Sequence, residues 1–161
     1  MNRPYRIAFV CLGNICRSPM AESVLTRQLA EAGLATDVEV DSAGTGGWHV
    51  GDGVDRRAVD ALQRRGYQSV HRARQFQRAD FAVHDLIVAI DEDNARDLHQ
   101  LAPDADAAAK IRLLRSFDSK SDGDLAIPDP YYGTEHDFEH ALDLIEASCD
   151  GLVAWVRDEL A

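Results

Sequence analysis

Residues 11–18 read Cys-Leu-Gly-Asn-Ile-Cys-Arg-Ser and stand between the apolar run at 7–10 and Pro19. An apolar run, a short loop and a helix-forming segment in this order are typical of a strand that turns directly into a helix. The first backbone amides of a helix lack partners and carry partial positive charge, so the loop before them can hold an anion. The stretch therefore predicts an α/β protein with an anion-binding loop after its first strand.

Two side chains give this loop its chemistry. Five residues separate Cys11 from Arg17, enough to curl the chain around one tetrahedral oxyanion with its amides turned inward. The Arg17 guanidinium can hold two phosphate oxygens, and the same positive field stabilises a thiolate at Cys11. The spacing predicts attack of the Cys11 sulfur on a bound phosphorus atom. The alternative is that Cys11 only packs in the core as a small apolar residue.

The neighbouring residues favour the anion-binding interpretation. Ser18 suits the N-cap and Pro19 the first position of the following helix. Gly13 and Asn14 tolerate left-handed backbone conformations, which a tight anion-binding loop requires.

Composition bounds the class of protein. The chain has 161 residues, a net charge of −11 and 45% hydrophobic residues, as expected for one globular domain rather than a membrane protein. Residues 1–78 hold 11 basic and 8 acidic residues, so the loop lies in the basic half, but the overall acidity argues against nucleic acid as a partner. Three cysteines and no convincing signal peptide favour the cytoplasm and no membrane association.

Apolar runs and amphipathic stretches alternate along the chain. The expected strands are residues 5–10, 38–41, 86–90 and 111–114, and the expected helical stripes span 21–29, 54–62, 95–101 and 138–156. Such alternation predicts a parallel sheet covered by helices on both faces, with its ligand beyond the carboxyl ends of the strands. We expect one domain over residues 1–161: a three-layer sandwich around a four-stranded parallel sheet.

A candidate general acid occurs in the segment Ile-Pro-Asp-Pro-Tyr-Tyr-Gly at 127–133. Two prolines stiffen the backbone around Asp129, and aromatic neighbours can exclude water from it. Taken alone, such a segment more often forms only a surface loop.

Five motifs in this order resemble the low-molecular-weight protein tyrosine phosphatases. They are VCLGNICRSP at 10–19, DSAG at 41–44, HRARQ at 71–75, IDEDN at 90–94 and DPYYG at 129–133. The resemblance implies that Cys11 is the nucleophile, Arg17 the phosphate clamp and Asp129 the general acid of a phosphatase that forms a phosphocysteine. It implies no cofactor and no metal, and tyrosine-phosphorylated proteins, inorganic phosphate and oxyanion inhibitors as binding partners.

The same resemblance assigns supporting roles. Asn14, Ser18, Ser42 and His71 match the family's hydrogen-bond network around the loop, and Asp91 matches a carboxylate that orients the histidine. The residues expected to contact the substrate are Leu12, Gly13, Asn14, Ile15, Cys16, Ser18, Trp48, Tyr131 and Tyr132. Trp48 and Tyr131 would form two walls around a phosphotyrosine ring.

Several alternatives stay open at this level. A phosphoarginine phosphatase has the same loop, but such family members carry threonine where this chain has Ile15. An arsenate reductase of this fold needs two downstream cysteines, whereas Cys16 lies within the loop and Cys149 on an expected core stripe. A phosphopeptide-binding module without catalysis would not need Cys11 and Asp129. The resemblance also favours a protective disulfide between Cys11 and Cys16, although Cys16 equally suits packing beneath the loop.

Overall fold

A computed structural model describes residues 3–161 and contains a four-stranded, entirely parallel sheet. The strands β1 (Tyr5–Cys11), β2 (Val38–Gly44), β3 (Leu86–Ala89) and β4 (Ile111–Leu113) lie in the order β2-β1-β3-β4. Strand β1 is central, and its residues 7–10 are fully buried because helices cover both faces. The central position places the carboxyl end of β1 at the point where the strand order reverses.

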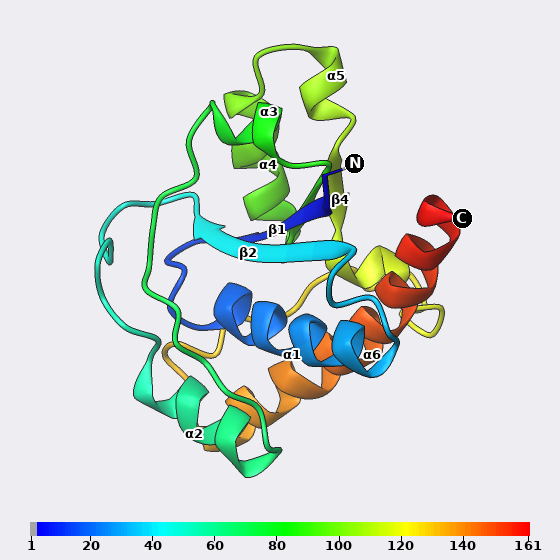
Figure 1. The fold of residues 1–161 in the computed structure, drawn as a ribbon. Coiled ribbons are helices and arrows are strands. Elements are labelled where there is room, and N and C mark those ends of the chain that lie inside the picture. Colours follow the sequence, from blue (N-terminus) through cyan, green and yellow to red (C-terminus); the bar gives the residue numbers. More distant parts are fainter. Residues whose placement is uncertain (1–2) are drawn as a thin grey trace.

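Helices form the two outer layers of the sandwich (Figure 1). One face carries α1 (Arg17–Glu31), α2 (Arg56–Arg64) and α6 (Glu135–Leu160), which pack around Phe9, Val88 and their neighbours. The other face carries α3 (Asp80–Val83), α4 (Glu92–Leu101) and α5 (Ala105–Ala108), with Val10 and Ile87 among the buried residues there. Alternate strand residues therefore supply two separate cores, and the predicted three-layer architecture is confirmed.

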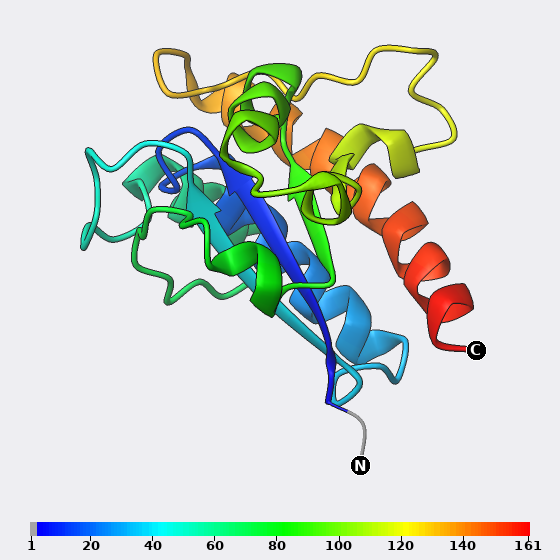
Figure 2. The same cartoon turned by 90° about the horizontal axis from the view of Figure 1, so that it is seen from above.

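The loops that follow β1 and β2 meet at one end of the sheet, to which both strand arrows point in Figure 2. Gly44 ends β2 beside the loop after β1, and a Cβ atom on Gly44 would lie 2.7 Å from the Leu12 carbonyl oxygen. Glycine is required there because the two backbones approach so closely.

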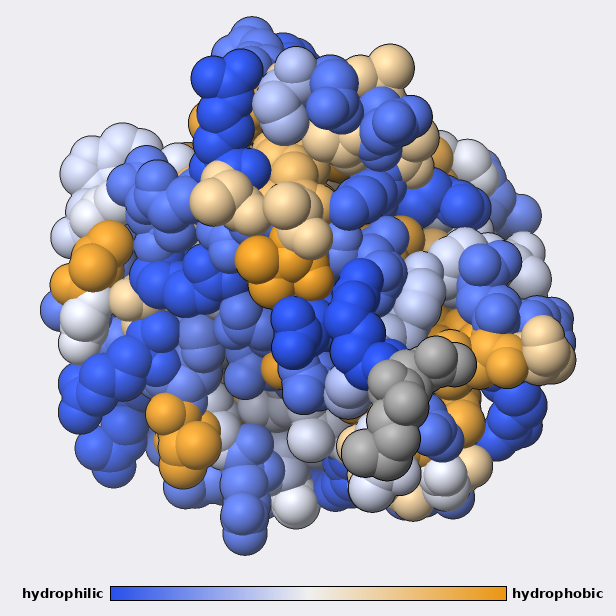
Figure 3. Space-filling view, turned by 45° about the horizontal axis from the view of Figure 1, so that its top comes forward, coloured by the Kyte–Doolittle hydropathy of each residue, from blue (hydrophilic) through white to orange (hydrophobic). Residues whose placement is uncertain are grey.

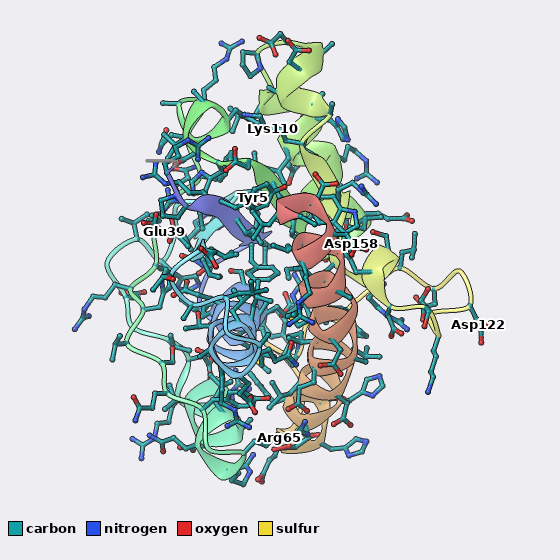
Figure 4. The ribbon with its side chains drawn as sticks, turned by 45° about the vertical axis from the view of Figure 1, so that its right-hand side comes forward. Tyr5, Glu39, Arg65, Lys110, Asp122 and Asp158 are labelled. Atoms are coloured by element: carbon teal, nitrogen blue, oxygen red, sulfur yellow. The ribbon has the colours of Figure 1, made fainter. Side chains whose placement is uncertain are left out.

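An ionic cluster joins the end of α2 to α6. Arg65 forms salt bridges with Glu139 at 2.9 Å, with Asp143 at 2.8 Å and with Glu146. Figure 4 shows Arg65 at this junction, where α2 approaches the first half of α6. The arrangement fixes the helix that follows the loop at 45–53 against the longest helix of the fold.

The surface in Figure 3 is mainly hydrophilic, with hydrophobic residues in small separate groups. Among residues 3–161, no helix is both long enough and apolar enough to cross a membrane.

The structure differs from the expected elements mainly at their ends. Strand β2 extends three residues beyond the expected end at Asp41 because residues 42–44 continue to pair with residues 9–11 of β1, and Gly44 also pairs with residues 74–76. The short helices α3 and α5 and the 3-10 helix Leu114–Phe117 were not expected. Each has only four residues, too few to show an apolar period in the sequence.

Candidate active site

The loop between β1 and α1 forms a cup with its carbonyl groups anchored outward. Thr45 and Gly46 donate backbone hydrogen bonds of 2.9 Å to the carbonyls of Cys11 and Leu12, and Asp55 donates one of 2.8 Å to the carbonyl of Ile15. In a trans peptide the next N–H points opposite to the carbonyl. The amides that follow these three carbonyls therefore turn away from the anchors, toward the inside of the cup, where they can bind an anion.

Cys11 lies at the floor of this cup and is 3% exposed. Its Sγ is 2.9 Å from the Ser18 hydroxyl and accepts a hydrogen bond from the Asn14 amide at 3.3 Å. The Asn14 side-chain amide donates to Ser18 Oγ at 2.8 Å, so the Ser18 hydroxyl can direct its own hydrogen to the sulfur, which lies closer than the Ala43 carbonyl at 3.5 Å. Both contacts fix the position of the sulfur at the floor of the cup.

Helix α1 begins at Arg17 with Cys16 at the N-cap, so the prediction that Ser18 caps it is wrong. Ser18 instead directs its hydroxyl to Cys11, and Pro19 occupies the third helical position, where a missing N–H is tolerated. Only Asn14 adopts the expected left-handed conformation, with φ of 58°. Gly13 does not adopt it; the side chain of His49 lies 3.1 Å from where a Cβ atom would be.

Asn14 links the loop to two neighbouring segments. Its side-chain amide donates to Ser42 Oγ at 3.0 Å, and its carbonyl oxygen lies 2.6 Å from His71 Nε2 and 3.0 Å from the Arg74 amide. The expected contacts of Asn14, Ser42 and His71 are therefore present. All are at least half-buried, so the left-handed turn at Asn14 is held by directed bonds rather than by glycine.

Glu22, which sequence reasoning missed, completes this network. Its Oε1 accepts from Ser42 at 2.7 Å and lies 3.3 Å from His71 Nδ1. Burial raises the pKa of Glu22 to about 7, and burial lowers the pKa of His71. A neutral His71 with its hydrogen on Nε2 donates to Asn14, and its Nδ1 can accept a hydrogen bond from a protonated Glu22 carboxyl.

Asp91 serves Arg17 and not His71, which corrects the expectation from the sequence. Arg17 Nη1 donates to Asp91 Oδ2 at 2.6 Å and to the Ile127 carbonyl at 2.9 Å. Asp91 follows β3 whereas His71 lies near β2, and β1 stands between these strands. The sheet order therefore separates the two residues.

Arg17 is 3% exposed and stays charged in this setting. Burial disfavours its charge, but the facing Cys11 sulfur and the hydrogen bond to Asp91 outweigh that cost and raise the pKa of Arg17. Arg17 Nη2 lies 3.7 Å from Asp129 Oδ2. The guanidinium therefore lies near the candidate acid and interacts electrostatically with the candidate nucleophile, Cys11.

A pocket of about 340 Å³ opens above the cup. Asp129 reaches it from the loop before α6, with Oδ1 accepting from the Tyr131 amide at 3.1 Å. Trp48, Tyr131 and Tyr132 form the rim, together with Leu12. Trp48 is 74% exposed, so it is not a core anchor.

His49 is a pocket residue that the sequence analysis missed. It contacts the cup beside Gly13, its ring lies 6.2 Å from the Tyr131 ring, and Asp52 binds its Nδ1 at 3.2 Å. The Gly-rich stretch around it predicted a loop but could not show that this loop folds back over the cup.

One group of three potential metal ligands occurs in residues 3–161: Glu22, Asp41 and His71, with ligand atoms within 4.8 Å of one another. Each of the three side chains already has a hydrogen-bond partner. Arg74 donates to Asp41 at 2.6 Å, Ser42 donates to Glu22, and His71 binds Asn14. The cluster serves as a hydrogen-bond network behind the loop. Cys149 is fully buried in the core, as expected, and His136 and His140 at the start of α6 are exposed.

Comparison with known proteins identifies this arrangement. The family model of the low molecular weight phosphotyrosine protein phosphatases matches residues 6–161. The chain belongs to this family. A relative from Streptomyces coelicolor named low molecular weight protein-tyrosine-phosphatase is 52% identical over 157 residues, which is 97% of this chain and 96% of the relative.

Two further matches cover almost the whole phosphatase chain. The low molecular weight protein-tyrosine phosphatase A of Mycobacterium tuberculosis is 48% identical, with 100% of this chain and 97% of the relative covered. The crystal structure of a protein tyrosine phosphatase from Entamoeba histolytica, with Hepes in the active site, superposes with a TM-score of 0.92. It is 34% identical and covers 98% of this chain and 99% of its own.

Proposed function

We propose that this phosphatase family member hydrolyses phosphotyrosine in proteins, and small aryl phosphates, through a phosphocysteine intermediate. The observation that carries the proposal is the arrangement of Cys11, Arg17 and Asp129 around one pocket. A buried sulfur with two hydrogen bonds, a charged guanidinium and a carboxyl group are the three groups that phosphoryl transfer to a thiolate requires.

The first step transfers the phosphoryl group to the enzyme. The Cys11 thiolate forms a bond to phosphorus while the bond from phosphorus to the aryl oxygen breaks. Asp129, at the mouth of the pocket, gives its proton to the departing oxygen. Loop amides and Arg17 stabilise the charge on the three equatorial oxygens.

The second step regenerates the enzyme. A water molecule gives up a proton to the ionised Asp129 and attacks phosphorus, and the bond between phosphorus and the Cys11 sulfur breaks. Inorganic phosphate leaves, so phosphate and similar oxyanions act as competitive inhibitors. Asp129 thus loses one proton in the first step and regains one from water in the second, so the cycle consumes only the ester and one water molecule.

Pocket depth supports an aromatic ester as the substrate. The sulfur is buried beneath a rim of aromatic side chains, so a phosphate must stand on a long, flat stem to reach it. Ile15, 8% exposed, adds an apolar wall within the cup. We expect hydrolysis of phosphotyrosine peptides to exceed that of phosphoserine and phosphoarginine peptides of matched sequence. Equal or preferred hydrolysis of phosphoarginine would contradict the assignment.

The alternatives fit less well. An arsenate reductase of this type needs two downstream cysteines, and Cys149 is buried on α6. A binding module needs neither the sulfur nor the acid. We further propose that the protein acts in the cytoplasm, where thiols stay reduced.

Asp129→Asn is expected to reduce turnover by ~10²–10⁴-fold for aryl phosphates with poor leaving groups. The effect should be smaller for 4-nitrophenyl phosphate, whose phenolate departs without a proton. Measuring kcat/KM for a series of substituted aryl phosphates tests this. An equal loss for all of them would mean that Asp129 is not the acid.

Oxidation of the active-site sulfur is expected to be reversible. Peroxide converts the Cys11 thiolate to a sulfenic acid, and the Cys16 thiol can displace water from it to form a disulfide. Burial raises the pKa of Cys16, so Cys16 stays a thiol and Cys11 is the sulfur that peroxide oxidises first. We expect a thiol reductant to restore the peroxide-treated enzyme.

The variant Cys16→Ala should be inactivated permanently under the same treatment, and Cys149→Ala serves as the matched control. Mass spectrometry of the oxidised enzyme should show a link between Cys11 and Cys16. Sulfinic Cys11 with a free Cys16 thiol would refute the disulfide.

A further inference from the structure

The first residues of α2 touch both loops that build the active site. The Asp55 amide donates to the carbonyl of Ile15 in the phosphate loop. The Asp55 carboxylate caps α2 by accepting from the Arg57 amide at 2.9 Å. This helix start is therefore fixed to the cup that holds Cys11.

Arg57 extends from this fixed point to the loop that carries Asp129. Its Nη2 donates to the Tyr131 carbonyl at 2.8 Å, and its Nη1 approaches the Gly133 carbonyl at 3.5 Å. Its Nε and Nη2 also bind Asp55, at 3.1 and 3.0 Å. The guanidinium carbon lies 5.7 Å from the centre of the Tyr131 ring and 4.7 Å from that of Phe138.

Tyr131 connects Arg57 to Asp129 through its two backbone hydrogen bonds. The Tyr131 amide donates to Asp129, while its carbonyl accepts from Arg57, so both polar backbone groups of one residue are occupied. The following turn is equally constrained: the Gly133 amide donates to the Pro130 carbonyl at 2.8 Å. Movement of Arg57 would release the segment between Asp129 and the start of α6.

We infer that Arg57 is a positioning residue that sets the placement of Asp129 relative to Cys11. The inference rests on the proposed role of Asp129 as general acid. Asp55 and Arg57 together connect the phosphate loop (residues 11–18) to the acid loop (residues 127–133) and fix the distance between them; we call this pair the brace. A shift of about 1 Å in a catalytic group can cost on the order of 10²-fold in rate, so such a brace matters for turnover.

Charge alone does not explain this contact. The Arg57 side chain is 41% exposed, and an ion pair at that exposure contributes little to stability. A planar guanidinium can donate to a carboxylate and to two carbonyls at once, whereas a lysine ammonium cannot match that geometry. The structure therefore assigns the role to the directed bonds of Arg57.

The test compares Arg57→Gln and Arg57→Lys with Arg56→Gln. Arg56 is the neighbouring arginine, 89% exposed and paired with Asp60, and its replacement should change nothing. In Arg57→Gln, kcat/KM for phenyl phosphate should fall ~10-fold or more, but less than ~3-fold for 4-nitrophenyl phosphate. Arg57→Lys should lose part of the rate with the same selectivity. The inhibition constant of inorganic phosphate should stay unchanged.

A double-mutant cycle separates positioning from general damage. In an Asp129→Asn background, Arg57→Gln should no longer change the ratio of the two kcat/KM values. The inference is overturned if Arg57→Gln lowers kcat/KM equally for both substrates, or if it weakens phosphate binding as much as turnover. It is also overturned if Arg57→Gln still changes the ratio of the two kcat/KM values when Asp129 has been replaced. Failure of the wild type to hydrolyse either substrate would instead overturn the proposed function.

Discussion

Cys11→Ser is expected to abolish hydrolysis while leaving phosphate binding intact. Loss of a catalytic nucleophile costs at least about 10⁴-fold in kcat, because a serine hydroxyl is not ionised at neutral pH. The loop keeps its shape because its carbonyl groups accept from the backbone amides of Thr45, Gly46 and Asp55, which the substitution does not touch. Turnover of 4-nitrophenyl phosphate and calorimetric titration with phosphate measure the two properties.

Cys149→Ala is the control for this experiment, since it removes a buried thiol on α6 far from the pocket lining. It should retain activity. Hydrolysis by Cys11→Ser at near wild-type rate would show that the sulfur is not the nucleophile.

Arg17→Lys should lower kcat/KM by ~10²–10³-fold or more. The guanidinium binds Asp91 and the Ile127 carbonyl through Nη1 and keeps further N–H groups for phosphate. A lysine ammonium is a point charge and cannot bind the carboxylate, the carbonyl and two phosphate oxygens in that geometry.

Steady-state kinetics with aryl phosphates measures this loss. The control Arg96→Lys, on the exposed face of α4, should behave as wild type. A wild-type kcat/KM for Arg17→Lys would mean that charge suffices and that the bidentate geometry is not used.

The layer architecture was predictable because its signals are local. Apolar runs such as 7–10 and the stripe from Phe138 to Val156 match the strand and helix periods. Strand order was not visible in any single run. Strand order depends on how the connecting segments cross the sheet and on how the two cores pack. Both are determined by contacts between residues far apart in the sequence.

That Cys11, Arg17 and Asp129 line one pocket was also predictable, because Cys11 and Arg17 share one short loop and the family resemblance joins Asp129 to them. Partners across the sheet were harder to assign. Motif matching paired Asp91 with His71, but the sheet order places Asp91 beside Arg17 and Glu22 beside His71. Ser18 has the chemistry of an N-cap, yet its hydroxyl serves the sulfur.

His49 and Arg57 were missed for a different reason. Each lies in a segment whose sequence predicts only a loop or a helix start, and each reaches the site because that segment folds back over it. The pattern Asp55-x-Arg57 predicts a capped helix. Only the tertiary arrangement shows that its arginine meets the acid loop.

Asp91 divides its two carboxylate oxygens between different tasks. Oδ2 binds Arg17, and Oδ1 accepts from the Asn94 amide and so caps α4. Thermodynamic linkage follows from this sharing: a ligand that orders the Arg17 side chain also orders Asp91 and so stabilises the first turn of α4. We therefore expect phosphate binding in the cup to slow amide hydrogen exchange in the first turn of α4, on the opposite face of the sheet.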